Sequence, residues 1–278
     1  MADPVPGVRL FEVLREDAVG TFQRGEDVAS GEPVAVRRLH GHLCDDDAAR
    51  MVFAEELRRI ATLDHPRLVR VRRHDTRAAV PWMVTDPLDG ETLENSLAAA
   101  PWPAAVARAF VADVLTSFVL LEKRRQFHAA PIPSRFVRIG DGWRLSTFRD
   151  VRAEDEAPRV KGRAAEPAWA APETDSAHPD VPKARTLSAW AAGALWLGCV
   201  TGRPPPARGG AAHPALSESD RAILARWLDP SAAKRPYGAD ACLALLTDAA
   251  GGAGASGGAP NPPPSPVAPL VVKKRAPR

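Results

Sequence analysis

Cysteine is scarce in this sequence, which has three in 278 residues, at Cys44, Cys199 and Cys242. An odd number of widely spaced cysteines excludes a disulfide framework, and it excludes a zinc site built from CxxC pairs. Proteins of oxidising compartments often depend on such frameworks, so we expect this chain to be cytoplasmic.

Long hydrophobic runs are missing as well. The longest nearly uncharged apolar run, Leu187 to Val200, is shorter than the roughly 20 residues that a membrane-spanning helix needs. The first ten residues, MADPVPGVRL, lack the charged start and apolar core of a secretory signal. We therefore expect no export and no integral membrane segment.

Acidic residues are absent from the carboxyl-terminal end. The formal net charge is +3, but the last thirty residues hold four cations and no acid, which leaves the rest of the chain at −1. These cations are Lys273, Lys274, Arg275 and Arg278. The body therefore presents no basic field, and we predict no nucleic-acid partner. The glycine, alanine, serine and proline that dominate 249–278 predict a disordered, Pro/Gly-rich basic tail.

What the chain does contain is typical of a soluble globular protein, with 45% apolar and 26% charged residues. From Phe11 to about Thr85, short β-branched and aromatic runs alternate with turn signals around one helical stretch, which predicts a small sheet with a helix. From about Glu91 to Leu246 the pattern is mainly helical, with one hairpin around Gly140-Asp141-Gly142. The fold class is therefore α+β.

Eight segments follow one another in a familiar order. They are FEVLRE, TFQRGEDVASGEPVAVRRL, FAEELRRIATLDHPRLVRV, PWMVTDPLDGETL, HAAPIPSRFVRI, WRLSTF, AAPE and LDPSAAKRP. Their order and spacing resemble a bacterial serine/threonine protein kinase domain over about Leu10 to Leu246. The resemblance implies a bilobal fold, with a β-rich N-lobe at 8–86, a hinge at 87–91 and a larger helical C-lobe at 92–248, before the tail at 249–278.

Two ion pairs of the family scaffold are expected to remain. Strand alternation places Ala35 and Arg37 on one face, and helical spacing brings Glu56 within reach of Arg37. The resemblance implies that this face looks into the nucleotide cleft and that a lysine normally stands at Arg37, where it also holds two phosphates. Glu173 and Arg235 resemble the pair that anchors the activation segment to the large lobe.

The resemblance fails at the positions that handle charge in phosphoryl transfer. The catalytic aspartate is replaced by Ala130, whose methyl group cannot accept a proton. The phosphate-contacting lysine is replaced by Ile132. The two metal ligands are replaced by Arg135 and Thr147, and a guanidinium repels a divalent cation. We predict no metal site and no catalytic residue, and absent or weak binding of ATP and magnesium.

The phosphate loop and the adenine pocket also depart from the family. The loop is reduced to Asp17-Ala18-Val19-Gly20 with a single glycine, so its amides are not expected to close over phosphates. Phe22 stands where kinases place the valine above the adenine, and Ser188 replaces a buried aspartate. Possible remnants of a nucleotide site are Ala35, Arg37, Thr85, Asp86 and Leu88.

Three functions stay open at this point. The first is a catalytically inactive pseudokinase that acts as a protein-binding scaffold or regulatory module, with an unidentified protein partner and the option of a homodimer. The second is an atypical, weakly active kinase that recruits Asp141, Asp150 or Asp86 for metal. The third is a metal-independent anion or nucleotide sensor, built from the guanidiniums Arg37, Arg135 and Arg149.

One further run, from His40 to Asp47, contains metal-ligand residue types at close spacing. Its three aspartates, Asp45 to Asp47, also suit the start of a helix, where acids cap free amides and favour the positive end of the dipole. We therefore interpret the three aspartates as the start of a helix and not as metal ligands.

Overall fold

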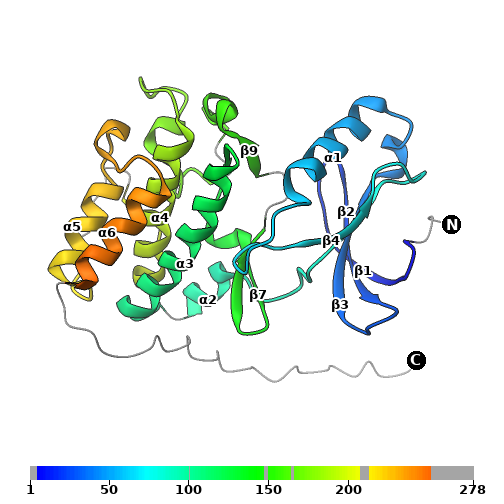
Figure 1. The fold of residues 1–278 in the computed structure, drawn as a ribbon, viewed down its shortest axis with the longest axis horizontal. Coiled ribbons are helices and arrows are strands. Elements are labelled where there is room, and N and C mark those ends of the chain that lie inside the picture. Colours follow the sequence, from blue (N-terminus) through cyan, green and yellow to red (C-terminus); the bar gives the residue numbers. More distant parts are fainter. Residues whose placement is uncertain (1–4, 100, 147–149, 164–165, 207–212, 252–278) are drawn as a thin grey trace, which may run out of the picture.

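The computed structural model describes residues 5–99, 101–146, 150–163, 166–206 and 213–251. A five-stranded antiparallel sheet occupies the amino-terminal part and helices occupy the carboxyl-terminal part (Figure 1). This confirms the α+β class and is consistent with a kinase-like fold. The predicted tail lies outside the described residues from 252 onward.

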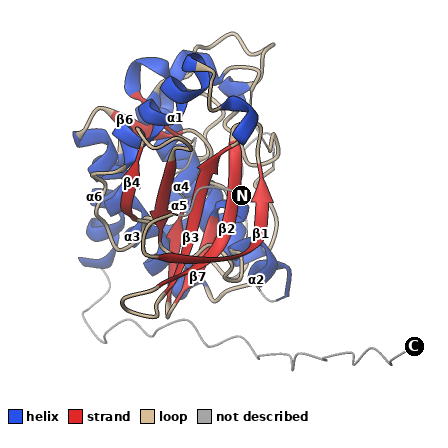
Figure 2. Ribbon diagram, turned by 90° about the vertical axis from the view of Figure 1, so that its right-hand side faces the viewer, coloured by secondary structure: helices blue, strands red, loops and turns tan. Residues whose placement is uncertain are grey.

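The sheet has the strand order β1-β2-β3-β5-β4, with every neighbouring pair antiparallel (Figure 2). Its strands are β1 (Val8–Glu16), β2 (Gly20–Asp27), β3 (Pro33–Leu39), β4 (Val71–Asp75) and β5 (Trp82–Thr85). Helix α1 (Asp47–Ile60) buries Phe53, Leu57 and Ile60, whose three- and four-residue spacing forms one apolar face.

The start of α1 explains the acidic run before it. The Asp46 carboxylate accepts hydrogen bonds from the amides of Ala48 and Ala49, at 2.8 and 3.2 Å, as an N-cap does. This confirms the predicted helix start. No group of three or more His, Cys, Asp or Glu side chains in the described ranges is placed to hold a metal ion.

The carboxyl-terminal part is built around one buried helix. Almost every residue of α4 (Ala184–Thr201) is buried, and it packs against its neighbours α3, α5 and α6. This arrangement explains why the sequence of α4 is apolar on all sides. The other helices are α2 (Leu93–Ala99), α3 (Ala104–Lys123), α5 (Glu218–Trp227) and α6 (Ala239–Gly251).

Helix α3 is the one described helix with the length and apolar composition needed to cross a membrane. In this structure it packs against α4 and α6, and Val111, Val114 and Leu115 are buried in the core. The central helix of a globular domain has the same composition. The absence of an integral membrane segment therefore stays a prediction.

Short strands join the two parts of the molecule. The predicted hairpin is formed by β7 (Phe136–Ile139) and β8 (Gly142–Leu145), while β6 (Gln126–His128) pairs with β9 (Val151–Ala153). The Leu145 carbonyl accepts a hydrogen bond from the Val69 amide at 2.9 Å, just before β4. The hairpin is thus attached to the segment that leads into β4.

Candidate functional site

The β1–β2 turn closes on its own aspartate. Asp17 Oδ1 accepts hydrogen bonds from the amides of Val19 at 2.8 Å and Gly20 at 3.0 Å, and the Asp17 amide donates to the Gly20 carbonyl at 3.0 Å. These are the amides that a glycine-rich loop would offer to a phosphate. Here the Asp17 carboxylate already accepts hydrogen bonds from the Val19 and Gly20 amides.

The same carboxylate reaches the buried guanidinium of β3. Arg37 Nη2 lies 3.1 Å from Asp17 Oδ2, and Arg37 Nη1 lies 2.6 Å from Glu56 Oε1. The Arg37 side chain is 0% exposed. Two charge-assisted hydrogen bonds therefore hold this guanidinium from both sides. The pairing of Arg37 with Glu56 was expected from the sequence, whereas that of Asp17 was not, because a turn aspartate gives no local sign of a partner twenty residues away.

Aromatic and cationic side chains fill the neighbouring space. Phe22 of β2 is buried, and its ring centroid lies 4.2 Å from the Arg15 guanidinium carbon and 5.1 Å from that of Arg37. Partial burial lowers the pKa of Arg15, and the positive charge of Arg135 adds to this effect. Part of the Arg15 side chain nevertheless remains exposed. Arg15 was not among the site residues expected from the sequence.

The hinge side chains are held by hydrogen bonds within the chain. The Thr85 hydroxyl donates to the Asp86 carbonyl at 2.8 Å. The Asp86 carboxylate is 2% exposed and lies 3.0 Å from Arg72 Nε and 2.5 Å from Arg144 Nη1. The Asp86 carboxylate is therefore engaged by two guanidiniums. Two other predicted remnants lie nearby, with Ala35 fully buried and Leu88 partly buried against the core.

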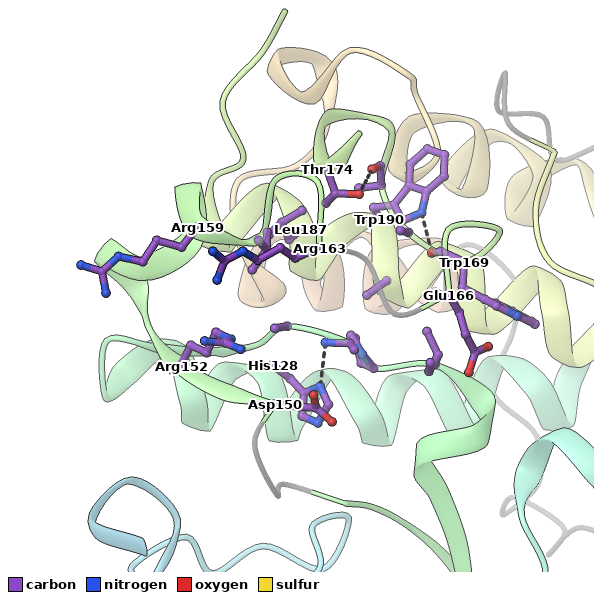
Figure 3. Close-up of a pocket in the computed structure, with 18 residues that line it drawn as sticks. His128, Asp150, Arg152, Arg159, Arg163, Glu166, Trp169, Thr174, Leu187 and Trp190 are labelled. Atoms are coloured by element: carbon purple, nitrogen blue, oxygen red, sulfur yellow. Dashed lines mark hydrogen bonds between the residues drawn. The ribbon is translucent and has the colours of Figure 1, made fainter. Parts of the chain in front are cut away.

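The segment after β6 is held by a buried histidine. His128 is buried, its Nδ1 accepts a hydrogen bond from the Ala130 amide at 3.2 Å, and its Nε2 donates to the Ser146 carbonyl at 2.8 Å (Figure 3). Burial lowers the pKa of His128, which favours the neutral ring that these two bonds require. The ring therefore fixes the backbone of the loop, and at Ala130 that loop presents a methyl group.

The other candidate residues of this region are dispersed or paired. Arg135 Nε lies 3.2 Å from Asp150 Oδ2, and Ile132 is buried. Asp141 is exposed on the hairpin turn, so the three acids considered for metal binding do not meet. Thr147, which replaces a metal ligand, and Arg149, which was considered for anion binding, lie outside the described residues.

The pair that anchors the segment before α4 is fully buried. Arg235 Nη1 and Nη2 lie 2.7 and 2.9 Å from the two carboxylate oxygens of Glu173, and both side chains are 0% exposed. The Arg235 guanidinium carbon also lies 4.8 Å from the centroid of the Trp190 ring. A bidentate pair of this kind fixes the geometry of the segment.

Taken together, the sheet with its ion-paired helix, the histidine-anchored loop and the buried pair are consistent with a protein kinase-like fold. No protein-family model matches the chain. It is 26% identical to the serine/threonine-protein kinase AfsK of Streptomyces coelicolor over 180 residues, which are 64% of this chain and 22% of AfsK. It is 29% identical to the serine/threonine-protein kinase PkaA of the same organism over 217 residues, covering 70% of this chain and 39% of PkaA. The chain is thus distantly similar to bacterial serine/threonine protein kinases and spans well under half of the length of either.

Proposed function

We propose that this kinase-like domain has no phosphotransferase activity and acts as a protein-binding scaffold or regulatory module. The observation that supports this most is the closed arrangement of Asp17, Arg37 and Glu56. A carboxylate of the chain satisfies both the turn amides and the guanidinium on which phosphates would have to rest. A phosphate entering there would have to displace a buried ion pair, which is costly.

The loop after β6 supports the same proposal. Phosphoryl transfer by kinases depends on positioning and electrostatics, supplied by metal ligands and by an acid that accepts the hydroxyl proton. At Ala130 this chain offers a methyl group, and the nearby acid Asp150 is paired with Arg135. We further propose a cytoplasmic location, a protein partner and no nucleic-acid partner, as the composition suggests.

A metal-independent anion or nucleotide sensor is the second candidate. It is favoured by the approach of Arg15 to both Arg37 and Arg135, which concentrates positive charge beside the sheet. However, three acids offset these three cations, namely Asp17, Glu56 and Asp150. The atypical kinase is supported less, because Asp86 is paired with Arg72 and Arg144 while Asp150 pairs with Arg135.

Thermal unfolding with ATP distinguishes the three functions, with magnesium present in one series and EDTA in the other. A scaffold shows no shift of the melting temperature, an enzyme shows a magnesium-dependent shift, and a sensor shows a shift that persists in EDTA. Incubation with labelled ATP, magnesium and generic substrates completes the test. Autophosphorylation that Glu56→Gln abolishes would overturn the proposal.

A further inference from the structure

A pocket separate from the ion pairs of the sheet lies in the helical part of the molecule. It has a volume of about 100 Å³, and its described lining residues all fall between His128 and Ala191. One wall is the loop after β6, and the other is formed by the segment before α4 together with α4 itself (Figure 3). No local sequence pattern predicts this pocket, because its two walls are far apart along the chain.

The walls of the pocket are largely apolar. Ala129 and Ala130 contribute small side chains on one side, while Trp169, Leu187 and Trp190 line the other. The Trp190 indole nitrogen donates a hydrogen bond to the Trp169 carbonyl at 3.1 Å, so this wall is held in place (Figure 3). Two successive alanines leave space that longer side chains would fill, which makes room for part of a ligand.

Three arginines stand at one end of the pocket. The guanidiniums of Arg152 and Arg163 point into the space between the walls, whereas Arg159 extends outward (Figure 3). Within the described part of the chain, Arg152 and Arg163 form no ion pair, and Arg152 Nε is buried without a hydrogen-bond partner. Arg159 is 73% exposed and has a 3.4 Å contact with Glu156. An anion in the pocket would satisfy charges that this part of the protein leaves unpaired.

The two acids that line the pocket already have partners. Asp150 Oδ2 lies 3.2 Å from Arg135 Nε, an ion pair in which neither atom has a hydrogen-bond partner among the described residues. Glu166 Oε1 accepts a hydrogen bond from the Ser134 hydroxyl at 2.7 Å. Arg135 and Ser134, which are not among the pocket's described lining residues, therefore partly stabilise the negative charge of these two acids. The balance of charge facing a ligand is positive.

We propose that this pocket binds a phosphorylated serine or threonine side chain of a partner protein. A phosphate on such a side chain carries a charge between about −1.5 and −2 and three acceptor oxygens, which suits arginine forks approaching from two walls. The apolar walls accept an aliphatic or aromatic side chain next to the phosphorylated residue. This inference rests on the proposed function as a binding domain and names the chemistry of its partner.

The test uses the full chain and fluorescent nonapeptides with a central phosphothreonine or phosphoserine and varied flanking residues. Fluorescence anisotropy should detect binding of a subset of these peptides and no binding of their unphosphorylated counterparts. The double substitution Arg152→Gln with Arg163→Gln should weaken binding at least ten-fold, because it removes charge-assisted hydrogen bonds. Inorganic phosphate should compete in the wild-type protein.

Two matched variants separate a specific pocket from general charge effects. Arg58→Gln removes an arginine whose side chain is 75% exposed on α1, and it should leave peptide affinity unchanged. Ala130→Leu keeps the arginines but fills the cavity, and it should weaken binding of peptides with large apolar neighbours.

Two results overturn the inference. One is a folded wild-type protein, shown by its cooperative melting, that does not distinguish phosphorylated from unphosphorylated peptides. The other is peptide binding that survives the double arginine substitution. Phosphoryl transfer by the wild-type protein would instead overturn the proposed function, so the two failures are distinguishable.

Discussion

Arg37 shows how one side chain changes the chemistry of a shared scaffold. A lysine at this position would bring a compact, adaptable ammonium group, whereas arginine brings a planar fork that binds two carboxylates at once. Asp17 and Glu56 are those carboxylates. The charge that would hold phosphates in a kinase is thus used to join the β1–β2 turn, β3 and α1.

The first prediction concerns the stability of this arrangement. Arg37→Met should lower the free energy of unfolding by about 3–5 kcal/mol, because Asp17 and Glu56 would lose the buried cation between them. Denaturant unfolding measures the effect. The control is Arg9→Met, which removes an exposed pair with Glu26 and should cost less than about 1 kcal/mol. Equal effects of the two substitutions would contradict the role assigned to Arg37.

The second prediction concerns the blocked anion site. Asp17→Asn keeps an oxygen that can accept from the turn amides but removes the negative charge beside Arg37, so the variant should bind tripolyphosphate more tightly than the wild type. Melting curves with tripolyphosphate and without metal measure this. Asp27→Asn is a matched control, because Asp27 also accepts amide hydrogen bonds in a turn and pairs with an arginine. A ligand-induced shift no larger in Asp17→Asn than in the wild type would contradict the prediction.

At the scale of whole elements, helix α6 begins against a buried acid of α3. Both carboxylate oxygens of Glu122 accept from the Ala239 amide, at 3.1 and 3.0 Å. Burial raises the pKa of Glu122, with Asp240 adding to the effect and the Ala239 amide, Ser188 and Arg185 opposing it. One acid thereby holds the start of α6 on α3 and couples their packing to pH.

The third prediction follows from the direction of that shift. Because the folded protein binds the Glu122 proton more tightly than the unfolded chain, stability is lost as the pH rises from the ordinary pKa of a glutamate toward the raised value. Glu122→Gln removes this loss, so its free energy of unfolding relative to the wild type should increase between pH 4.5 and 7.5. Denaturant unfolding across this range measures it.

Glu55→Gln provides a control of opposite sign. The hydrogen bond and charge of Arg58 lower the pKa of Glu55, so the stability that this acid adds is present at high pH and lost as the pH falls. Relative to the wild type, Glu55→Gln should therefore lose stability as the pH rises toward 4.5 and should change little above it, so this control extends the measurement below pH 4.5. If the difference in unfolding free energy between Glu122→Gln and the wild type stays constant with pH, the raised pKa assigned to Glu122 is contradicted.

Over the whole molecule, the described structure is consistent with a kinase-like fold, and the proposed loss of activity concerns a few positions within it. The buried pair Glu173–Arg235 and the neutral ring of His128 still fix the segments around the loop. Ala130, Ile132 and Arg135 occupy positions where the resemblance implies charged or polar catalytic groups. Phosphoryl transfer needs these groups together, because some of them position the reactants while others stabilise the charge of the transition state.

The fourth prediction tests this dependence. Ala130→Asp alone should leave phosphate incorporation from labelled ATP at the background level, because an acid without metal ligands and phosphate contacts cannot support the reaction. Ala130→Asn is the control for the added volume. Incorporation above background in Ala130→Asp but not in Ala130→Asn would show that the remaining cleft can bind nucleotide productively.

Much of the fold could be predicted because its signals are local. The spacing of Phe53, Leu57 and Ile60 indicates a helix face, the acidic run before α1 indicates its start, and the glycines around Asp141 indicate a hairpin turn. The candidate site was harder to predict from the sequence. Arg37 and Glu56 could be paired through the resemblance, but Arg15 and Asp17 carry no local mark that distinguishes them from other charged residues near a turn.

Local sequence patterns specify the class of fold, the order of the elements and the kinds of side chain at each kinase-like position. Which charges meet is settled by packing, which brings Asp17 to Arg37, Asp86 to Arg144, and Arg152 beside the pocket. Periodicity and capping act over a few residues. Ion pairing in a chain with 37 cationic and 34 acidic residues depends instead on distances that exist only after distant segments have packed.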